Sequence, residues 1–373
     1  MSLRVGIDAH HLNGKPQGSR TYLLHLIRAL ASLPERDSSE LRIFSFRPEQ
    51  TDSALAIEDV VHRRVFPESA KLRIPFVVPA IELLERLHVF HSQYIVPPLS
   101  FIPEVVTIHD VLFETHAELF RGAFSERSVR LIRRSALRAS VVLTVSEFSR
   151  NAILERYGLP EEKVVVTPNA VDHDRFRVLE NDLSELRGRY GLDGPFVLTV
   201  GRLEPRKNLE RLIRAFARVR ERLDRGLRLV LVGAEDFRHE SILTEMNRLP
   251  SGSVVRLGTV PDADLPAIYN AARAFAYPSL AEGFGMPVLE AMACGTPVLT
   301  SPRGALPEVS GDAVLFVDPL DEDDLGDGLE RILGDSVLRY RLREAGKARA
   351  ALFSWEETAR RTMAVYRLAS QRN

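Results

Sequence analysis

Short apolar runs alternate with amphipathic helical stretches along the chain, and this alternation constrains the fold more than any other sequence feature. Most of the runs are apolar on both faces and end at Gly, Pro or Ser, which is typical of buried parallel strands. Strands that alternate with helices predict βαβ units and parallel sheets. We expect strands at 3–8, 41–46, 89–91, 105–109, 141–145, 164–166, 196–201, 229–232, 254–257, 274–277, 298–300 and 314–317.

The length of the chain predicts two domains. Its 373 residues exceed the size at which a single hydrophobic core usually stops growing. A polar, glycine-containing stretch at 168–195 separates the two series of strands, so we place the linker there. We expect an N-terminal domain, a linker, a C-terminal domain and a last helix that packs back toward the N-terminal domain, over 1–170, 171–195, 196–354 and 355–373.

Composition excludes several classes of function. A net charge of −1 provides no overall attraction to nucleic acid. The single cysteine, Cys294, excludes an intramolecular disulfide and a multi-cysteine zinc site. The N-terminus lacks the pattern of a signal peptide, and the apolar stretch 74–87 is too short and too charged to span a bilayer. We therefore expect a cytoplasmic protein.

The segment Gly201–Asn208, GRLEPRKN, combines a strand end, a tight loop and a helix start. Asn208 is a favourable N-cap residue, and Arg202 and Lys207 flank the loop. A helix start favours anions, and an arginine adds donors that match a diphosphate. The segment therefore predicts a phosphate site, although two solvated surface charges are an equally simple explanation.

A second segment, Glu282–Gly295, follows the strand at 274–277. Its Gly-x-Gly lets the backbone approach a ligand, and Pro287 suits the first helical position. Glu282 then lies in the loop above the sheet and Glu290 in the first turns of the helix, where carboxylates can accept hydrogen bonds from sugar hydroxyls. The alternative is a helix-capping Glu282 and an exposed Glu290.

The chain resembles retaining glycosyltransferases of the family 4 type. The motifs that match follow one another in the family's order over nearly the whole chain: His109-Asp110, Val145-Ser146-Glu147-Phe148-Ser149, Gly201-Arg202-x4-Lys207 and Glu282-x7-Glu290. The resemblance implies the α/β architecture called GT-B, in which two Rossmann-like domains with parallel sheets face each other across a deep cleft. The N-terminal domain would bind the acceptor and the C-terminal domain the nucleotide sugar.

The resemblance also implies roles for residues of the C-terminal half. Arg202 and Lys207 would stabilise the donor diphosphate and the charge that grows on the leaving group. Glu282 would bind hydroxyls of the transferred sugar, and Glu290 those of the ribose. Further donor contacts would come from the backbone N–H groups of Phe284, Gly285, Val288 and Leu289, and from Gly258 to Val260 beside the base.

In the N-terminal half the resemblance implies that His109 approaches the donor sugar. From its position alone, a histidine that only satisfies the strand end is the simpler interpretation. Gly18 would let the backbone approach the diphosphate, and Arg20 would add charge, although the spacing in this loop departs from the family's commonest one. The loop contains no Gly-x4-Gly-Lys-Ser/Thr, which excludes a P-loop.

The family implies a metal-independent, same-face transfer without a cofactor, from a GDP-mannose-type donor or a UDP-sugar to a glycan, lipid-linked or small-molecule acceptor. The sequence Leu203–Arg206 resembles that of bacterial transferases that add mannose or rhamnose to surface polysaccharide. Three alternatives stay open: a hydrolysing epimerase, a phosphorylase and a silent nucleotide-sugar-binding subunit. A nicotinamide-dependent dehydrogenase is disfavoured because no Gly-x-Gly-x-x-Gly follows the first strand.

A basic stripe is predicted on the helix at 126–138, because every fourth or third residue on one face is an arginine. Such stripes dock on anionic lipid in interfacial helices, although a solvated face is the more common explanation. The stripe consists of Arg127, Arg130, Arg134 and Arg138.

Overall fold

The computed structural model describes residues 2–14, 18–34, 39–57, 60–120, 125–180 and 182–371. Residues 15–17, in the predicted loop before Gly18, lie outside the described residues. Contacts divide the chain into two compact units, which are described separately. Unit 1 comprises the described residues of Met1–Thr115, Phe124–Asn169 and Ser354–Asn373, and unit 2 those of His116–Ala123 and Ala170–Phe353.

Unit 1 contains a seven-stranded sheet in the order β3-β2-β1-β4-β5-β6-β7, and all its pairings are parallel. The pattern of apolar runs predicts every strand except β3, whose sequence VHRR lacks such a run; β3 forms one edge of the sheet, and its last two residues are exposed. The strands are β1 Leu3–Asp8, β2 Ser39–Ser45, β3 Val61–Arg64, β4 Val89–Gln93, β5 Glu104–Thr107, β6 Val141–Thr144 and β7 Val164–Val166.

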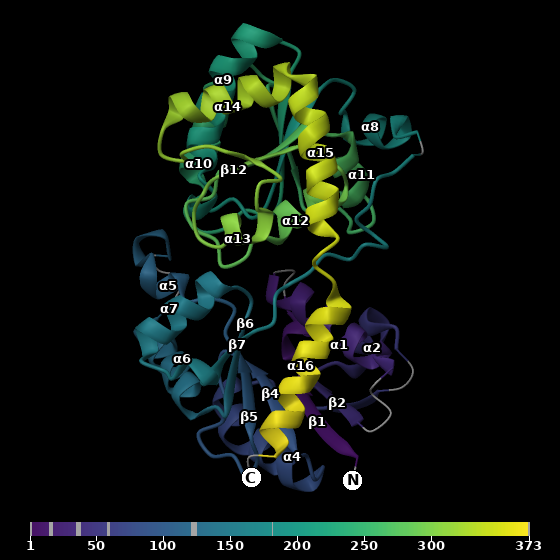
Figure 1. Cartoon of the computed structure of the whole chain (residues 1–373), viewed down its shortest axis with the longest axis vertical. Helices are drawn as coiled ribbons and strands as arrows, with labels where there is room; N and C mark the ends of the chain where they lie inside the picture. Colours follow the sequence, from purple (N-terminus) through teal and green to yellow (C-terminus); the bar gives the residue numbers. More distant parts are fainter. Residues whose placement is uncertain are drawn as a thin grey trace. The chain divides into compact units, whose positions relative to one another are not determined.

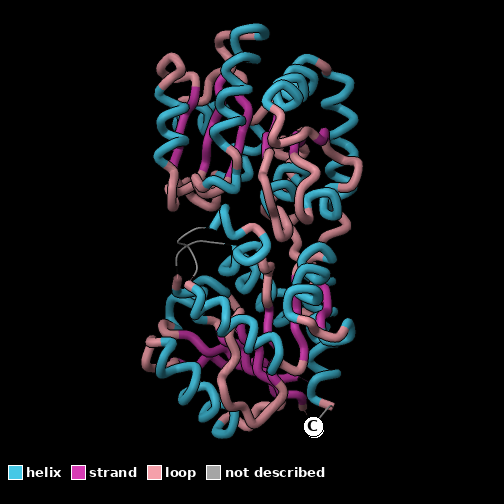
Figure 2. Tube along the Cα trace, turned by 90° about the vertical axis from the view of Figure 1, so that its left-hand side faces the viewer, coloured by secondary structure: helices cyan, strands magenta, loops and turns pink. Residues whose placement is uncertain are grey.

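Helices cover both faces of this sheet (Figures 1 and 2). The predicted helix 126–138 is confirmed as α6. The helical elements of unit 1 are η1 His10–Asn13, α1 Gly18–Ser32, α2 Pro48–Leu55, α3 Ala70–Leu72, the π-helical η3 Arg73–Val77, α4 Val78–Leu84, α5 Leu112–Thr115, α6 Glu126–Arg138, α7 Glu147–Tyr157, η5 Glu161–Lys163 and α16 Trp355–Ser370.

The C-terminal helix α16 belongs to unit 1, where it lies along α1 and contacts β1, β4 and β5. Three polar contacts fix it: the Tyr366 hydroxyl lies 2.6 Å from His91 Nδ1, Thr358 Oγ1 donates to the Pro168 carbonyl at 2.6 Å, and Ser39 Oγ lies 3.8 Å from Met363 Sδ. Tyr366 is completely buried. The end of the chain is therefore part of the core that surrounds the first strands.

Unit 2 contains a six-stranded parallel sheet in the order β10-β9-β8-β11-β12-β13. Its strands are β8 Phe196–Val200, β9 Arg228–Val232, β10 Val254–Gly258, β11 Ala274–Tyr277, β12 Val298–Thr300 and β13 Leu315–Phe316. Its helical elements are η4 Ala117–Phe120, α8 Ser184–Tyr190, η6 Pro205–Lys207, α9 Leu209–Leu223, α10 Glu240–Asn247, α11 Leu265–Ala271, α12 Met286–Ala293, α13 Leu306–Ser310, α14 Glu322–Gly334 and α15 Ser336–Ala350.

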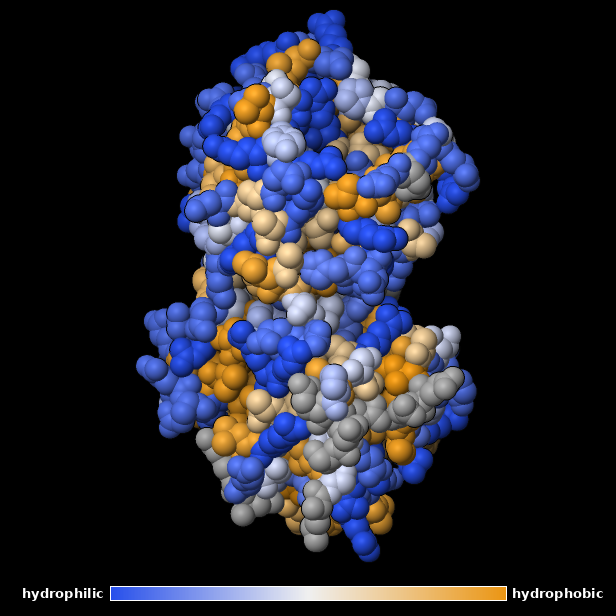
Figure 3. All heavy atoms as spheres, turned by 45° about the vertical axis from the view of Figure 1, so that its right-hand side comes forward, coloured by the Kyte–Doolittle hydropathy of each residue, from blue (hydrophilic) through white to orange (hydrophobic). Residues whose placement is uncertain are grey.

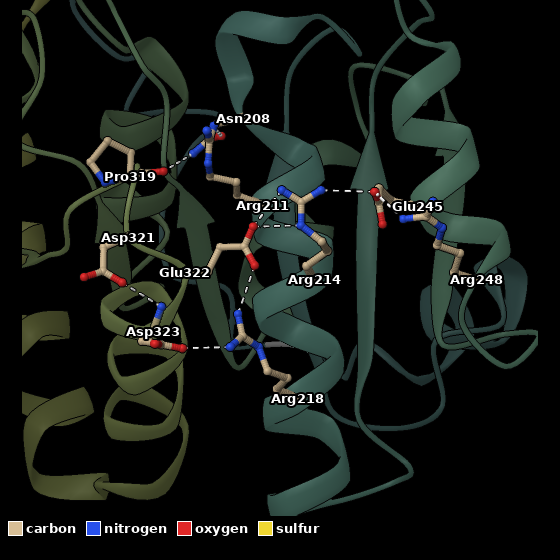
Figure 4. Close-up of polar contacts among 10 residues, drawn as sticks. All are labelled: Asn208, Arg211, Arg214, Arg218, Glu245, Arg248, Pro319, Asp321, Glu322 and Asp323. Carbon is tan, nitrogen blue, oxygen red and sulfur yellow. Dashed lines mark hydrogen bonds and ion pairs between the residues drawn. The ribbon is translucent and has the colours of Figure 1, made fainter.

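A charged network joins α9 to α14 and α10 on the surface of unit 2 (Figure 4). Arg214 donates to Glu322 at 2.7 Å and to Glu245 at 3.0 Å. Arg218 donates to Glu322 at 3.0 Å and to Asp323 at 2.7 Å. Because α9 follows the loop of residues 201–208 directly, this network anchors the helix at whose start the candidate phosphate site lies.

Both sheets have the strand order of doubly wound α/β domains, in which the direction of winding reverses beside the first strand of the domain. The prediction of two Rossmann-like parallel domains is therefore confirmed. No helix in the described part of the chain is long and apolar enough to cross a membrane. On the face shown in Figure 3, hydrophobic residues form separate groups among more numerous hydrophilic ones.

Candidate functional site

In unit 2 the loop after β8 is fixed by Asn208, which has a left-handed backbone conformation. Asn208 is the N-cap residue of α9, as predicted, but its side chain makes no capping hydrogen bond. Instead, Asn208 Nδ2 donates to the Pro278 carbonyl at 3.2 Å and to the Pro319 carbonyl at 2.6 Å. Figure 4 shows the bond to Pro319. Asn208 therefore joins the loop that contains Lys207 to the loop that leads to Glu282.

Lys207 and Glu282 meet in a buried charged cluster. Lys207 Nζ lies 2.7 Å from Glu282 Oε1 and also contacts the Tyr277 hydroxyl. Arg206 Nη1 lies 2.5 Å from Glu282 Oε2, and Arg206 Nη2 donates to Glu204 Oε1 at 2.6 Å. The cluster thus combines two cations with two carboxylates, and the sequence analysis identified only Lys207 and Glu282.

The charges of this cluster determine its protonation. Burial by itself raises the pKa of Glu282. Arg206 and Lys207 lower it by more than burial raises it, so that the pKa falls to about 2. Burial and the neighbouring Arg206 lower the pKa of Lys207, whereas Glu282 acts in the opposite direction. Glu282 is therefore ionised at neutral pH and can accept hydrogen bonds but cannot donate a proton.

Arg202 lies outside this cluster. Its Nη1 is 2.5 Å from Asp236 Oδ2, and 49% of its side chain is exposed. The structure therefore does not join Arg202 to Lys207 and Glu282 by direct contact. The sequence analysis missed Arg206, although it belongs to the same segment and is the more buried arginine.

The segment around α12 is tightly packed. Gly285 has φ of +102°, and a Cβ there would lie 2.7 Å from Leu306 Cδ2. Phe284 is buried, and its ring centroid lies 5.9 Å from that of Phe353. The Val288 N–H donates to the Gly285 carbonyl at 2.9 Å. Val288 and Leu289 lie in the first turn of α12, and both side chains belong to the core of unit 2.

Glu290 follows Leu289 directly in α12, and its Oε2 accepts a hydrogen bond of 2.9 Å from the Tyr269 hydroxyl. Burial raises the pKa of Glu290, an effect that the Tyr269 bond and Arg175 partly offset. Glu290 and Glu282 therefore belong to separate polar groups. Tyr269, on α11, is a further candidate that the sequence pattern did not indicate.

The ends of β8, β9 and β10 come together through glycines. Gly233 N–H donates to the Gly258 carbonyl at 2.8 Å, and Gly201 N–H to the Val232 carbonyl at 2.9 Å. A Cβ on Gly233 would lie 2.0 Å from the Gly201 carbonyl oxygen, so only glycine fits there. Val260, which follows Gly258 by two residues, is buried. This edge of the sheet thus exposes little side-chain bulk, which lets a ligand approach the backbone.

In unit 1, His109 follows β5, and its Nε2 lies 3.0 Å from Gln93 Oε1. The rings of Tyr22 and Tyr94 surround it, with centroids at 4.8 Å and 5.6 Å. Burial, together with His11 and His91, lowers the pKa of His109 to about 3, so the imidazole is neutral at pH 7. Gln93 Nε2 is buried without a hydrogen-bond partner in the described structure, which makes Gln93 a further candidate residue.

The remaining predicted residues lie elsewhere in unit 1. Gly18 is the first residue of α1, and Arg20 Nε donates to the Leu12 carbonyl at 3.3 Å. A buried ion pair at the end of β1 joins Arg73 Nη1 to Asp8 Oδ2 at 2.5 Å, and the sequence analysis did not indicate it. The four predicted arginines of α6 are all exposed: Arg127, Arg130, Arg134 and Arg138.

Comparisons with known proteins agree with this geometry. The family model described as "Glycosyl transferases group 1" matches residues 185–349, and "Glycosyltransferase Family 4" matches residues 16–175. O-antigen chain mannosyltransferase B of Escherichia coli is 32% identical over 372 residues, covering 94% of this chain and 96% of that protein. A mannosyltransferase of Mycolicibacterium hassiacum, "MMP alpha-(1->4)-mannosyltransferase", is 33% identical over 249 residues, covering 65% of this chain and 58% of that protein.

Solved structures show the same fold. Anabaena HepE in complex with UDP and glucose has a TM-score of 0.77 at 21% identity, covering 97% of this chain and 99% of that one. WaaG, a glycosyltransferase involved in lipopolysaccharide biosynthesis, has a TM-score of 0.73 at 17% identity, covering 98% and 99%. The predicted resemblance is thereby confirmed, and the chain belongs to the GT-B glycosyltransferases that the group 1 and family 4 models describe.

Proposed function

We propose that this glycosyltransferase moves a hexose from a nucleoside-diphosphate sugar to a glycan acceptor, with retention of configuration and without a metal ion. The ion pair between Lys207 and Glu282 is the observation on which the proposal mainly depends. It combines an ammonium group suited to phosphate with an ionised carboxylate suited to sugar hydroxyls. The names of the mannosyltransferase relatives favour mannose and a GDP-mannose-type donor over a UDP-sugar.

The proposed donor site extends along the loops of unit 2. Lys207 and the half-exposed Arg202 would bind the diphosphate, and Glu282 would bind the transferred sugar. Glu290 would bind the ribose, with Gly258 and Val260 beside the base. Phe284, Gly285 and Leu289 would contribute backbone N–H groups at the start of α12, where the helix favours anions. The predicted Val288 N–H is not included, because it donates to the Gly285 carbonyl.

The proposed reaction is a same-face substitution. The acceptor hydroxyl oxygen bonds to the anomeric carbon while the bond from that carbon to the phosphate oxygen breaks. The acceptor's proton passes to the departing phosphate, and the nucleoside diphosphate leaves. Lys207 and Arg202 would stabilise the negative charge on the leaving group. The low pKa of His109 supports hydrogen bonding to the donor sugar by a neutral imidazole, and it argues against proton transfer by this residue.

A donor panel tests this function. Purified protein is melted with GDP, UDP, ADP, TDP or NAD, and then incubated with GDP-mannose or UDP-glucose and a mannose-containing oligosaccharide. We expect one nucleoside diphosphate to raise the melting temperature, since a ligand at 100 times its Kd adds about 2.7 kcal/mol. The Arg202→Ala/Lys207→Ala variant should lose that shift.

The product distinguishes the alternatives. A lengthened oligosaccharide with the donor's anomeric configuration, seen by NMR, supports a retaining transferase. A product with inverted configuration contradicts the proposed retention. Release or epimerisation of the sugar without acceptor supports the hydrolysing epimerase. Binding without any turnover supports a silent subunit, and a melting shift with NAD alone contradicts the proposed donor site.

We also propose that the exposed face of α6 contacts anionic membrane surfaces. Arg127, Arg130, Arg134 and Arg138 support this contact, because none of them forms an ion pair with a carboxylate in the described parts of the chain. Sedimentation with vesicles that contain phosphatidylglycerol tests it. The contact is excluded if wild-type protein stays in the supernatant at low salt. The cytoplasmic location remains a prediction from the sequence.

A further inference from the structure

A groove of about 630 Å³ lies in unit 1 between α3–η3 on one side and α6 on the other. Its volume falls within the range of about 300–1,000 Å³ that is typical of small-molecule sites. Apolar side chains from three segments face it, and one of them, Leu131, remains 36% exposed. The apolar lining residues are Ile74, Pro75, Ile95, Val96, Pro98 and Leu131.

Cations surround this apolar lining, and among the described residues no carboxylate lines the groove. Lys71 comes from α3, whereas Arg127, Arg134 and Arg138 come from α6. These three arginines span eleven residues, or about 16 Å along the helix axis. Arg130 is exposed on the same helix but does not line the groove. Of the four arginines on the predicted stripe, three therefore line the groove and Arg130 does not.

The groove adjoins the environment of His109 through one short segment. Gln93, at the end of β4, contacts His109, and the Tyr94 ring packs beside it. The next two residues, Ile95 and Val96, line the groove. Ser135 fixes this segment to α6, because its Oγ accepts from the Val96 N–H at 3.1 Å and donates to the Leu131 carbonyl at 2.9 Å.

The direction of α6 brings its first turn to the same edge. The helix links the parallel strands β5 and β6, so it runs antiparallel to both. Arg127 at its start therefore lies toward the carboxyl edge of the sheet, where His109 follows β5. Arg138 lies toward the opposite edge. A ligand that fills the groove can thus extend from the environment of His109 along the length of α6.

We propose that this groove binds the lipid part of the acceptor. The ligand is an amphiphile in which a long apolar chain is joined to a phosphate, with the chain against Ile95 and Leu131 and the phosphate at the arginines. Its use as an acceptor depends on the proposed transferase function, whereas its binding does not. An apolar lining with unpaired cations at its margin matches both parts of such a molecule.

The test measures binding of farnesyl phosphate, below its aggregation concentration, by titration calorimetry. We expect wild-type protein to bind it, and farnesol or inorganic phosphate alone to bind at least about tenfold more weakly, since each offers only half of the contacts. Arg134→Glu should weaken binding by about tenfold or more, because it places a negative charge beside the phosphate. Arg130→Glu, on the same helix but outside the groove, should weaken binding by less than Arg134→Glu, because it removes no cation that lines the groove.

A second matched pair tests the apolar lining. Leu131→Gln should weaken farnesyl phosphate binding by about tenfold, whereas Leu137→Gln, exposed on the same helix but outside the groove, should have no effect. Arg202→Ala, in unit 2, should also leave farnesyl phosphate binding unchanged. This control separates the groove from the proposed diphosphate site.

Three results would overturn the proposal: absence of farnesyl phosphate binding, equal sensitivity to Arg130→Glu and Arg134→Glu, or equal sensitivity to Leu131→Gln and Leu137→Gln. Vesicle sedimentation that depends on both arginines, without farnesyl phosphate binding, would indicate a bilayer surface instead of a chain-binding groove. Failure of the transferase function is recognised separately, because the melting shift with nucleoside diphosphates reports on unit 2.

Discussion

Lys207 Nζ lies 2.7 Å from Glu282 Oε1, although 75 positions separate the two residues in the chain. Arg206 binds the other carboxylate oxygen, so two cations orient Glu282 from both sides. The arrangement keeps a buried carboxylate ionised, since burial alone favours its neutral form. The orientation of Glu282 is thus determined by the protein before any ligand binds.

Substitution of Glu282 by Gln should separate catalysis from nucleotide binding. We expect turnover to fall by about 10²–10³-fold, because a preorganised charge near the reacting sugar is lost. The Kd of the nucleoside diphosphate should change by less than about threefold, because the proposed contact is with the sugar. Initial rates and calorimetry measure the two effects, with the exposed Glu308→Gln as control. A parallel loss of both would assign Glu282 to phosphate binding or to folding.

The two arginines of the loop should behave differently. Arg206→Ala removes the buried cation of Glu204 and one of the two that bind Glu282, so we expect the free energy of unfolding to fall by about 3–5 kcal/mol. Arg202 is half exposed, and Arg202→Ala should change the free energy of unfolding by less than about 1 kcal/mol.

Arg202→Ala should nevertheless weaken nucleoside-diphosphate binding by about tenfold, because a charge-assisted phosphate contact is lost. Urea unfolding and calorimetry on the same preparations distinguish the two roles. If Arg202→Ala destabilises the protein as much as Arg206→Ala, or leaves the affinity unchanged, its role in binding the donor is excluded.

His109 should remain uncharged in the folded protein across the physiological range. Its pKa is lowered to about 3, below the usual 6.5, so the folded state resists a proton that the unfolded state accepts. The contribution of this group to stability is therefore complete above about pH 6.5 and is lost as the pH falls toward about 3. NMR of the ring nitrogens should show no His109 titration between pH 5 and 8, and a midpoint near 6.5 in urea. An inflection near 6.5 in the folded protein would contradict the neutral imidazole.

Glu104, at the start of β5, offers an opposite pH dependence. Burial and the adjacent Glu82 raise its pKa well above the usual value, and neither of its oxygens has a hydrogen-bond partner in the described residues. Its contribution to stability is present below about pH 4.5 and is lost as the pH rises. Glu104→Gln should therefore increase the free energy of unfolding at pH 8 by about 1–3 kcal/mol, with a smaller gain at pH 5.

Urea unfolding of the Glu104→Gln variant at both pH values measures this effect, with the exposed Glu68→Gln as control. A loss of stability at pH 8, or a gain that does not depend on pH, would show that Glu104 is ionised in the folded protein.

The positions of most strands and the two-domain organisation could be predicted because they depend on local patterns. Apolar β-branched runs closed by Gly or Pro specify buried parallel strands wherever the chain places them. The exception is β3, in which only Val61 of the four residues Val61–Arg64 is apolar, so the segment lacks the local pattern of the other strands. The segments that contain Lys207 and Glu282 could also be predicted, because each combines its characteristic residues within a short stretch of sequence.

Only the tertiary structure decided which side chains meet. Arg202 and Arg206 belong to the same segment as Lys207, but the turn of η6 directs Arg206 to Glu282 and leaves Arg202 beside Asp236. In the same way, the groove selects Arg134 and excludes Arg130, although both lie on one predicted stripe. A local pattern specifies the element on which a residue lies, whereas its partner is determined by packing between segments far apart in the chain.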